Sequence, residues 1–383
     1  MLDFDFQLRT RIVSGPGKVD SLGELAAALG AKRVLVVSDP GIIRAGHTER
    51  GLTSLRRAGL TAHVFDGVCE NPTTANIDAG LEVARRVEPD LLVGLGGGSS
   101  MDCAKGINFV YTNGGRMSDY WGVGKATRDM LPLIAVPTTA GTGSEAQSFA
   151  LISDAETHVK MACGDKKAAC RVALLDPVLT VTQPARVTSL TGIDALAHAV
   201  ETYVTKPRNA MSLVYSRAAW RLLEANFARV LSNPDDVAAR SGMQLGACLA
   251  GLAIENSMLG ATHALANPLT AHFGLVHGEA IGLMLPQVVR FNGPAADPWY
   301  HELLDDVAET NGSTAVDGGA EALSEFLAAL RDEAGLPARL SACGVDRAKL
   351  PQLAIEAAKQ WTASFNPRPI GVDDMLALYE QAF

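Results

Sequence analysis

An acid and an imidazole lie one helical turn apart in the apolar segment TGIDALAHAVETYVT, residues 191–205. Asp194 and His198 occupy positions i and i+4, so their side chains share one face of the expected helix, with Cβ atoms about 5–6 Å apart. Such a pair is more often a buried histidine hydrogen-bonded to an aspartate than half of a metal site. The segment alone therefore favours a structural role.

The segment MLGATHALANPLTAHFGLVHGEAIGLMLP, residues 258–286, changes this balance because it carries three of the eight histidines. Neutral imidazole and carboxylate are common ligands of Zn²⁺ and Fe²⁺ where cysteine is absent. Burying these groups in an apolar setting is costly unless each has a partner, and one divalent cation would satisfy them together. The predicted metal ligands are Asp194, His198, His263 and His277. His272, at the expected end of a helix, is the least favoured ligand.

A glycine-rich turn follows an apolar run in VGLGGGSSMDCAKGINFV, residues 93–110. Without side chains at Gly97 and Gly98, the backbone N–H groups can approach a ligand closely, and Ser99 or Ser100 can cap the helix that follows. A helix N-terminus offers unpaired donors and partial positive charge, which suits a phosphate or pyrophosphate. A sharp strand-to-helix turn without a ligand is the alternative interpretation.

The turn departs from the usual dinucleotide fingerprint GxGxxG, because no glycine stands at the third position. In the usual order of elements, the acid that binds the ribose follows the glycines by about 20 residues. Here the candidate acid is Asp39, which ends the earlier run VVSDPG. The sequence therefore predicts a nucleotide-binding fold whose order of elements is not the standard Rossmann one.

A second loop, PTTAGTGSE at residues 137–145, follows another apolar run and is dense in hydroxyl groups and glycine. Its hydroxyls can donate to phosphate, ribose or a nicotinamide amide, although an ordinary turn has the same composition. Two such loops after neighbouring expected strands strengthen the case for binding, because open α/β sheets bind ligands at the carboxyl ends of their strands. The candidate donors are Thr138, Thr139, Thr142 and Ser144.

The two halves of the chain show different periodicities. In residues 1–185 short apolar runs alternate with helical segments, which predicts a nucleotide-binding α/β domain with a mainly parallel sheet. In residues 186–383 the pattern is helical, which predicts an all-α domain that binds the metal. The expected strands cover 33–39, 62–68, 90–98, 131–136 and 171–177, with a hairpin over 149–164. The expected helices of the second domain cover 188–204, 209–230, 235–253, 258–272, 278–291, 298–309, 319–334 and 347–362.

The charge and cysteine content limit the partners and the compartment. A formal net charge of −9 over 383 residues argues against binding to nucleic acid or anionic membranes. No apolar stretch approaches the roughly 20 residues of a spanning helix, and the N-terminus lacks the apolar core of a signal peptide. The six cysteines show no CxxC spacing, which is typical of reduced thiols. We therefore expect a cytoplasmic protein without nucleic-acid or membrane partners.

The motifs GGGSSMD, PTTAGTGSE, GIDALAHAVETYV, HALANPL and VHGEA, in this order, resemble those of the iron-containing (group III) alcohol dehydrogenases. The resemblance covers nearly the whole chain, including NPRPIGVDDM at 366–375. It implies a Rossmann-like, dehydroquinate synthase-like α/β domain followed by an all-α domain with the metal, Fe²⁺ or alternatively Zn²⁺. It also implies hydride transfer between NAD(H) and a small primary alcohol or aldehyde, in a homodimer.

The resemblance assigns roles to particular residues. It implies metal binding by the same four residues, pyrophosphate binding by Gly97, Gly98 and Ser99, and cofactor contacts from the second loop. Lys160 matches a family lysine near the ribose, and Leu179 matches an apolar contact to the cofactor. Asp39 matches the acid that bonds the adenosine ribose, and its carboxylate would repel a 2′-phosphate, so we expect NAD rather than NADP.

Asn267 departs from the family pattern. Many members have a second histidine there, HALAH, which is thought to relay the alcohol proton, whereas this chain reads HALAN. Asn267 cannot titrate, so the relay would run through water, a ribose hydroxyl or another group such as His272. The expected wall of the substrate pocket includes Phe149, Met258, Trp361 and Phe365, which favours small to medium apolar substrates.

Three other functions fit parts of the pattern. A zinc-dependent, glycerol-type polyol dehydrogenase has the same architecture and ligand set. A carbon–oxygen lyase of the dehydroquinate synthase type would need a basic cluster for a phosphorylated substrate, and few lysines or arginines stand in the segments expected at the site. A non-catalytic metal- or nucleotide-binding protein would not require both loops and all four ligands.

Overall fold

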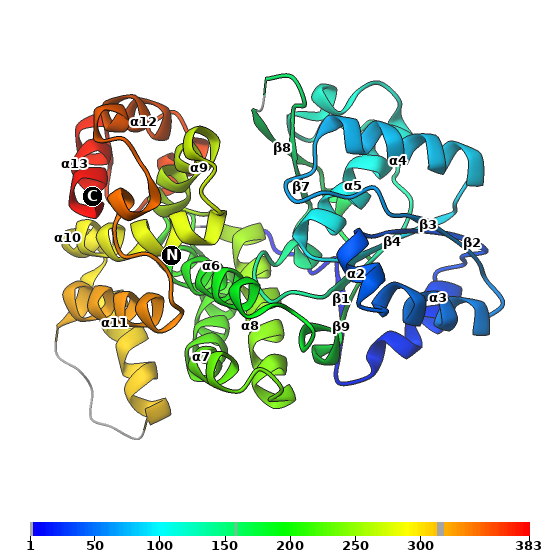
Figure 1. Cartoon of the computed structure of the whole chain (residues 1–383), viewed down its shortest axis with the longest axis horizontal. Coiled ribbons are helices and arrows are strands. Elements are labelled where there is room, and N and C mark those ends of the chain that lie inside the picture. Colours follow the sequence, from blue (N-terminus) through cyan, green and yellow to red (C-terminus); the bar gives the residue numbers. More distant parts are fainter. Residues whose placement is uncertain (1–2, 158, 312–317) are drawn as a thin grey trace. The chain divides into compact units, whose positions relative to one another are not determined.

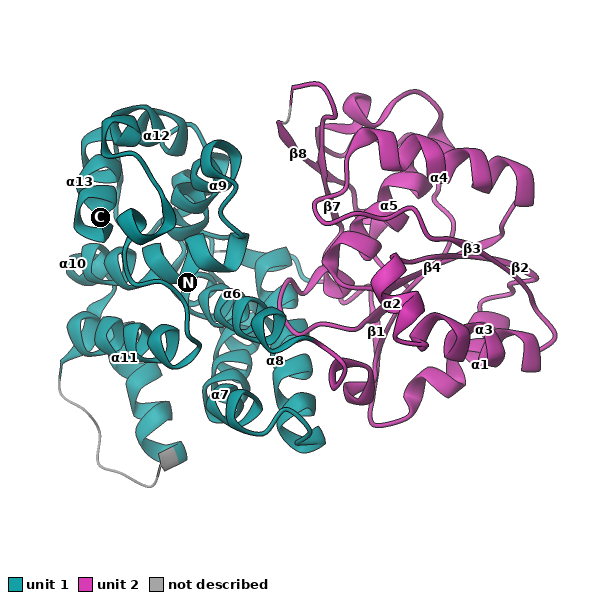
Figure 2. Cartoon of the chain, in the orientation of Figure 1, with its two compact units in different colours: residues 1–6, 184–383 teal, residues 7–183 magenta. Residues whose placement is uncertain are grey.

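The computed structural model describes residues 3–157, 159–311 and 318–383, and the chain forms two compact units (Figures 1 and 2). Unit 2 comprises Gln7–Gln183, and unit 1 comprises Met1–Phe6 together with Pro184–Phe383. The described residues 3–6 thus group with the second half of the chain, whereas the sequence analysis assigned residues 1–185 to the first domain.

Unit 2 contains a six-stranded sheet in which every pairing is parallel. The strands, in spatial order, are β1 (Arg11–Ser14), β9 (Val172–Leu175), β6 (Leu133–Pro137), β4 (Leu91–Gly96), β2 (Arg33–Val37) and β3 (Thr61–Phe65). The central strands are apolar and buried on both faces, as parallel strands covered by helices must be. The predicted α/β fold is confirmed, and β1 is an edge strand that the sequence analysis missed.

Helices cover both faces of this sheet (Figure 2). On one face, Leu35 and Val37 of β2 belong to an apolar cluster with residues of α4 (Thr74–Val87) and α5 (Gly98–Asn113). On the other face, Val34 and Val36 pack with residues of α1 (Leu22–Ala28) and α3 (His47–Arg57). The short helix α2 (Pro40–Arg44) follows β2 directly. This alternation of side chains along β2 is the period-two pattern of a strand with two buried faces.

The strand order changes direction beside β2. The chain leaves β2 for β3 on one side and returns to β4 on the other, so β2 and β4 flank a topological switch point. Open α/β sheets bind ligands outside the carboxyl ends of the strands at this point. The segments that follow β2, β4 and β6 are therefore the expected ligand-binding edge.

A second, three-stranded sheet completes unit 2. It contains β5 (Gly122–Val123), β8 (Lys160–Gly164) and β7 (Phe149–Ser153), and β7 and β8 pair antiparallel. The hairpin predicted over 149–164 is confirmed at these strands, while residue 158 lies outside the described residues. Short 3₁₀ helices in unit 2 are η1 (Lys18–Ser21), η2 (Met117–Tyr120), η3 (Ser144–Ala146), η4 (Lys166–Ala168) and η5 (Pro177–Thr180).

The described part of unit 1 is built from helices alone, as predicted for the second half of the chain. The α-helices are α6 (Ala185–Val204), α7 (Ala210–Ser232), α8 (Val237–Ser257), α9 (Ala261–Phe273), α10 (His277–Asn311), α11 (Gly319–Glu333), α12 (Leu350–Ala357) and α13 (Val372–Ala382). Three 3₁₀ turns, η6 (Leu340–Cys343), η7 (Arg347–Lys349) and η8 (Trp361–Phe365), lie among the last of them. The helix predicted over 347–362 is shorter than expected, and α13 was not predicted.

Helix α10 corrects one prediction. It is a single helix where the sequence predicted two, over 278–291 and 298–309. The helix contains three internal prolines, which ordinarily interrupt a helix, because proline removes a backbone donor and crowds the preceding turn. Tertiary contacts hold the middle of the helix instead: Asn292 exchanges two hydrogen bonds with Asn366, and Ala296 is fully buried.

Helix α8 is, by length and composition, apolar enough to cross a membrane, which the sequence analysis did not expect. However, 67% of its most apolar window is buried inside the structure, and core helices of globular proteins meet the same criterion. The helix packs chiefly against α7 and α6, so its apolar surface is explained by the core of unit 1.

Candidate functional site

The four predicted metal ligands converge in unit 1. The Oδ1 atom of Asp194 lies 3.3 Å from Nε2 of His198, 3.4 Å from Nε2 of His263 and 3.6 Å from Nε2 of His277. The Nε2 atoms of His198 and His263 are 3.1 Å apart. Ligand atoms at about 2.0–2.1 Å from one tetrahedral ion stand about 3.3 Å from each other. The separations therefore fit a single small cation.

Three helices bring these side chains together. Asp194 and His198 occupy the buried middle of α6, His263 lies in the first turn of α9, and His277 is the first residue of α10. Gly278 lets α10 begin this close to α6, because a Cβ there would lie 2.4 Å from the backbone oxygen of Leu190. The first three ligands are at most 5% exposed, while the side chain of His277 is 30% exposed, so the site reaches solvent on that side.

The charges at the site also fit a cation. The Oδ1 atom of Asp194 is buried and, among the described residues, has no hydrogen-bond partner despite the three imidazoles around it. Burial opposes ionisation of Asp194, but His198, His263 and His277 outweigh it and lower the pKa of the carboxyl group below its ordinary value. Burial also opposes the charged form of His263, but Glu201 and Asp194 outweigh it and raise the pKa of this imidazole to about 9. A divalent ion bound in place of the proton on Nε2 of His263 would leave the imidazoles neutral, and its two positive charges would balance those of Asp194 and Glu201.

Glu201 is a site residue that the sequence analysis did not single out. Its Oε2 atom lies 2.5 Å from Nδ1 of His263, the ring nitrogen that faces away from the convergence point. Burial acts to raise the pKa of Glu201, but His263 lowers it below its ordinary value. The signal in the sequence was its position on the Asp194 face, seven residues further along α6.

Asn267 and His272 stand in different positions relative to this site. Asn267 follows His263 by one turn on the same face of α9, and its Nδ2 atom donates to Oε1 of Gln360 over 3.1 Å. His272 is nine residues after His263, which places it on the opposite face of the helix and about 13 Å along its axis. It pairs instead with Glu356 at 2.7 Å. The helix geometry therefore argues against His272 as a proton relay.

The two candidate cofactor loops of unit 2 lie against each other. Gly97 is the N-cap of α5, and a Cβ there would lie 3.5 Å from Cγ2 of Thr139. A Cβ at Gly98 would approach Cγ2 of Thr142 to 2.7 Å, so a side chain does not fit. The backbone N–H of Thr138 donates to the carbonyl oxygen of Gly96 over 2.9 Å. The structure thus brings together the residues following β4 and β6, at the switch-point edge of the sheet.

Asp39 lies at the same edge, after β2. Its Oδ1 atom caps α2 by accepting hydrogen bonds from the backbone of Gly41 and Ile42, at 2.8 and 3.1 Å. Its Oδ2 atom accepts a hydrogen bond from Ser100 over 3.4 Å, in the first turn of α5. The Asp39 carboxylate therefore already accepts hydrogen bonds from within the protein, which the sequence analysis did not foresee.

Ser99 and Lys160 are linked through Asn71. Ser99 accepts a hydrogen bond from the backbone N–H of Asn71 over 3.3 Å, and Nζ of Lys160 lies 3.5 Å from Oδ1 of Asn71. Asn71 has a left-handed backbone (φ 52°), which asparagine tolerates better than most residues. In the sequence, the proline that follows Asn71, Pro72, could have indicated a turn at this position. Leu179, in η5, is buried in the apolar cluster with Val34 and Val36.

Ser144 has a structural environment. Its hydroxyl donates to Oδ1 of Asp102 over 2.6 Å and accepts from Nζ of Lys105 over 2.8 Å. Lys105 is fully buried and also donates to the backbone oxygens of Ser144 and Phe149, at 2.7 and 2.8 Å. Burial raises the pKa of Asp102, with Lys105 opposing. Asp102 and Lys105, both in α5, thus hold the second loop in place through Ser144.

The four candidate pocket residues are divided between the units. Phe149, at the start of β7, is half-buried in unit 2. Met258 in unit 1 ends α8 with a left-handed backbone (φ 71°). Trp361 and Phe365 of η8 form an edge-to-face pair with ring centroids 5.7 Å apart, and Trp361 is 45% exposed.

Comparisons with known proteins agree with this geometry. Family models described as "Iron-containing alcohol dehydrogenase" and "Fe-containing alcohol dehydrogenase family, C-terminal" match residues 9–177 and 188–383. The chain is 34% identical to 1,3-propanediol dehydrogenase of Citrobacter freundii over 99% of each chain. It is 32% identical to the NAD-dependent methanol dehydrogenase of Bacillus methanolicus over 97% of each. The chain belongs to the iron-containing alcohol dehydrogenase family.

A solved structure extends the similarity. Sulfoacetaldehyde reductase from Bifidobacterium kashiwanohense, crystallised in complex with NAD⁺, matches 100% of this chain with 99% of its own, at a TM-score of 0.90 and 25% identity. As a member of the iron-containing alcohol dehydrogenase family, the chain is an oxidoreductase that interconverts alcohols and aldehydes. This confirms the resemblance seen in the sequence motifs and argues against the lyase and the non-catalytic binding protein.

Proposed function

We propose that this alcohol dehydrogenase holds one divalent cation, Fe²⁺ or Zn²⁺, through Asp194, His198, His263 and His277. The convergence of one carboxylate and three imidazoles to separations of 3.1–3.6 Å is the observation that carries the proposal. A cation bound there would polarise the oxygen of the substrate and lower the pKa of its hydroxyl group. Unit 1 is then the metal-binding domain.

The cofactor in this proposal is NAD(H), which supplies or accepts the hydride. Unit 2 is then the nucleotide-binding domain, with Gly97, Gly98 and Ser99 at the pyrophosphate and Asp39 at the adenosine ribose. The second loop contributes Thr138, Thr139 and Thr142, while Ser144 supports the loop from within. Lys160 and Leu179 complete the expected contacts. The NAD-dependent methanol dehydrogenase and the NAD⁺ complex among the relatives support this choice.

The substrates in this proposal are small to medium primary alcohols and aldehydes. The edge-to-face pair of Trp361 and Phe365 in unit 1 supports an apolar pocket wall there. The six cysteines are free thiols, and four of them are buried. This supports a location in a reducing compartment such as the cytoplasm. We expect a homodimer, which light scattering on the purified chain would test.

The decisive experiment is a screen of the full chain after removal of bound metal and separate reloading with Fe²⁺ and Zn²⁺. Reduced-nicotinamide absorbance with a panel of alcohols and aldehydes should change only after reloading. Asp194→Asn and His277→Ala should lose metal retention and turnover while still binding NADH. Full turnover by a metal-free preparation would contradict the assignment of the four ligands.

A further inference from the structure

Glu201 touches His263 on the side away from the proposed cation. Asp194, His198 and Glu201 lie on one face of α6 at positions i, i+4 and i+7, and Glu201 is 4% exposed. Its Oε2 atom meets Nδ1 of His263 at 2.5 Å, whereas Nε2 of that ring faces the other ligands. Glu201 therefore contacts a candidate ligand without being one.

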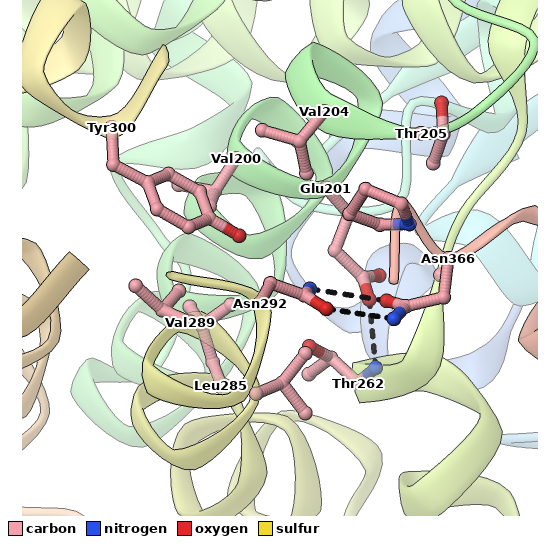
Figure 3. A pocket seen from close by; sticks show the side chains of 13 residues that line it. Val200, Glu201, Val204, Thr205, Thr262, Leu285, Val289, Asn292, Tyr300 and Asn366 are labelled. Atoms are coloured by element: carbon pink, nitrogen blue, oxygen red, sulfur yellow. Dashed lines mark hydrogen bonds between the residues drawn. The ribbon is translucent and has the colours of Figure 1, made fainter. Parts of the chain in front are cut away.

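The second oxygen of Glu201 holds the start of the helix that carries His263. Oε1 accepts a hydrogen bond from the backbone N–H of Thr262 over 2.7 Å (Figure 3). The N-cap of α9 is Gly260, which has no side chain to cap the helix itself, and a Cβ there would lie 3.0 Å from Oε1 of Glu201. Glu201 thus supplies from α6 a partner that the first turn of α9 lacks locally.

We propose that Glu201 is a positioning residue of the metal site. By accepting a hydrogen bond from Nδ1–H of His263, it fixes the neutral tautomer whose Nε2 lone pair is directed at the cation. By capping α9, it holds that ring at a set distance from Asp194 and His198. The proposal rests on the proposed function, because it presumes that the four residues bind a metal.

A carboxylate that accepts a hydrogen bond from the second ring N–H of a metal-binding histidine orients the ring and increases its basicity. Loss of such a carboxylate commonly weakens metal binding 10–100-fold. Glu201 also contributes buried negative charge, so charge and orientation must be separated. Glu201→Gln removes the charge but keeps the length of the side chain. Glu201→Asp keeps the charge but shortens the side chain by one methylene, so that it can no longer span both contacts.

Asn366 offers a matched control in the same turn. Its Oδ1 accepts a hydrogen bond from the backbone N–H of Ala261 over 3.3 Å, and its amide pairs with that of buried Asn292 (Figure 3). Among the described residues, Asn366 makes no hydrogen bond to His263. Asn366→Ala therefore disturbs the same polar cluster, and the same helix start, without removing the carboxylate.

The test titrates full-length metal-free protein with Co²⁺ and Zn²⁺ against a competing chelator and records the visible absorption of bound Co²⁺. Both Glu201 variants should bind each ion at least tenfold more weakly than wild type and change the Co²⁺ spectrum. Asn366→Ala should lower the melting temperature yet bind within about threefold of wild type. Binding by Glu201→Asp equal to wild type would overturn the positioning role, as would an equal loss in Asn366→Ala.

The experiment separates this inference from the assignment of the ligands. If the wild-type chain itself bound neither ion, the proposed metal site would be wrong. If the wild type bound both ions and the Glu201 variants bound them equally well, only the role of Glu201 would be wrong.

Discussion

Asn267 of α9 donates a hydrogen bond from Nδ2 to Oε1 of Gln360, 3.1 Å away. Gln360 is the residue immediately before η8, the turn that carries Trp361 and Phe365. The pair therefore ties the helix of His263 to two candidate pocket residues. Where many family members have a titratable histidine, this chain has an uncharged connection between two structural elements.

Replacing Asn267 with alanine should weaken substrate binding and leave the pH dependence of kcat unchanged. Loss of the connection to Gln360 should loosen η8 and raise KM for medium-length alcohols by about threefold to tenfold, the effect of about 1 kcal/mol of lost hydrogen bonding. Because an amide does not titrate, the pH dependence of kcat should keep its shape. Steady-state kinetics from pH 6 to 10 would measure both quantities.

Gln360→Ala provides the partner variant for a double-mutant cycle. If the two amides act as one unit, the double variant should resemble either single variant rather than the sum of both. A kcat profile that lost an ionisation in Asn267→Ala would show that the residue takes part in proton transfer after all.

Lys105 of α5 is bonded to the second cofactor loop through Ser144. Its ammonium group is fully buried, donates to three oxygens of Ser144 and Phe149, and lies 3.8 Å from Asp102. Lys105→Met would leave Asp102 buried without its cation, a change that typically costs about 3–5 kcal/mol. We expect a lower free energy of unfolding, measured in urea, and NADH binding weakened in the protein that remains folded.

Two controls test whether the charge pair is the cause. Lys166→Met removes an exposed lysine of η4, and it should change little. Lys105→Met combined with Asp102→Asn should be less damaging than Lys105→Met alone, because no uncompensated charge remains. Metal affinity should be unchanged in all three, since these residues belong to unit 2.

The sequence revealed those features that depend on local spacing. Asp194 and His198 could be paired because four residues make one helical turn, and the glycine and threonine loops could be located because they follow apolar strands. Glu201 was overlooked because a glutamate within a helix is usually solvated, and only the packing of α9 against α6 gives it a partner. The unbroken α10 was missed for the same reason: Asn366, far away in the sequence, stabilises the turn that local rules would break.

Glu224 should make stability depend on pH. Burial raises its pKa to about 7, against the favourable hydrogen bond from Thr310, and nearby Asp306 adds repulsion. The folded chain therefore holds a proton that the unfolded chain releases near pH 4.5, so this contribution is complete below pH 4.5 and is lost as the pH rises towards 7. Glu224→Gln, which cannot ionise, should be more stable than wild type at pH 8 by about 1 kcal/mol, after allowing for solvent screening.

Urea unfolding of metal-free protein at pH 5 and pH 8 would measure this difference without interference from metal binding. Glu309→Gln, at an exposed carboxylate that pairs with Arg221, is the matched control and should change the free energy of unfolding little. A constant difference between Glu224→Gln and wild type at both pH values would contradict the expected ionisation.

Asp39 should determine the choice between the two nicotinamide cofactors. One of its oxygens caps α2, and the other remains near Ser100 at the edge of the sheet where the glycine turn begins. A carboxylate about 4 Å from a 2′-phosphate in a wet site repels it by about 1 kcal/mol or more, so removing the charge should raise the NADPH/NADH ratio of kcat/KM about tenfold.

Asp39→Ser is the suitable change, because serine also caps helices and should leave α2 intact. Asp39→Ala removes both functions, so a loss of stability in Asp39→Ala but not in Asp39→Ser would separate capping from cofactor selection. A wild-type enzyme that already used NADPH more efficiently than NADH would show that this carboxylate does not face the ribose.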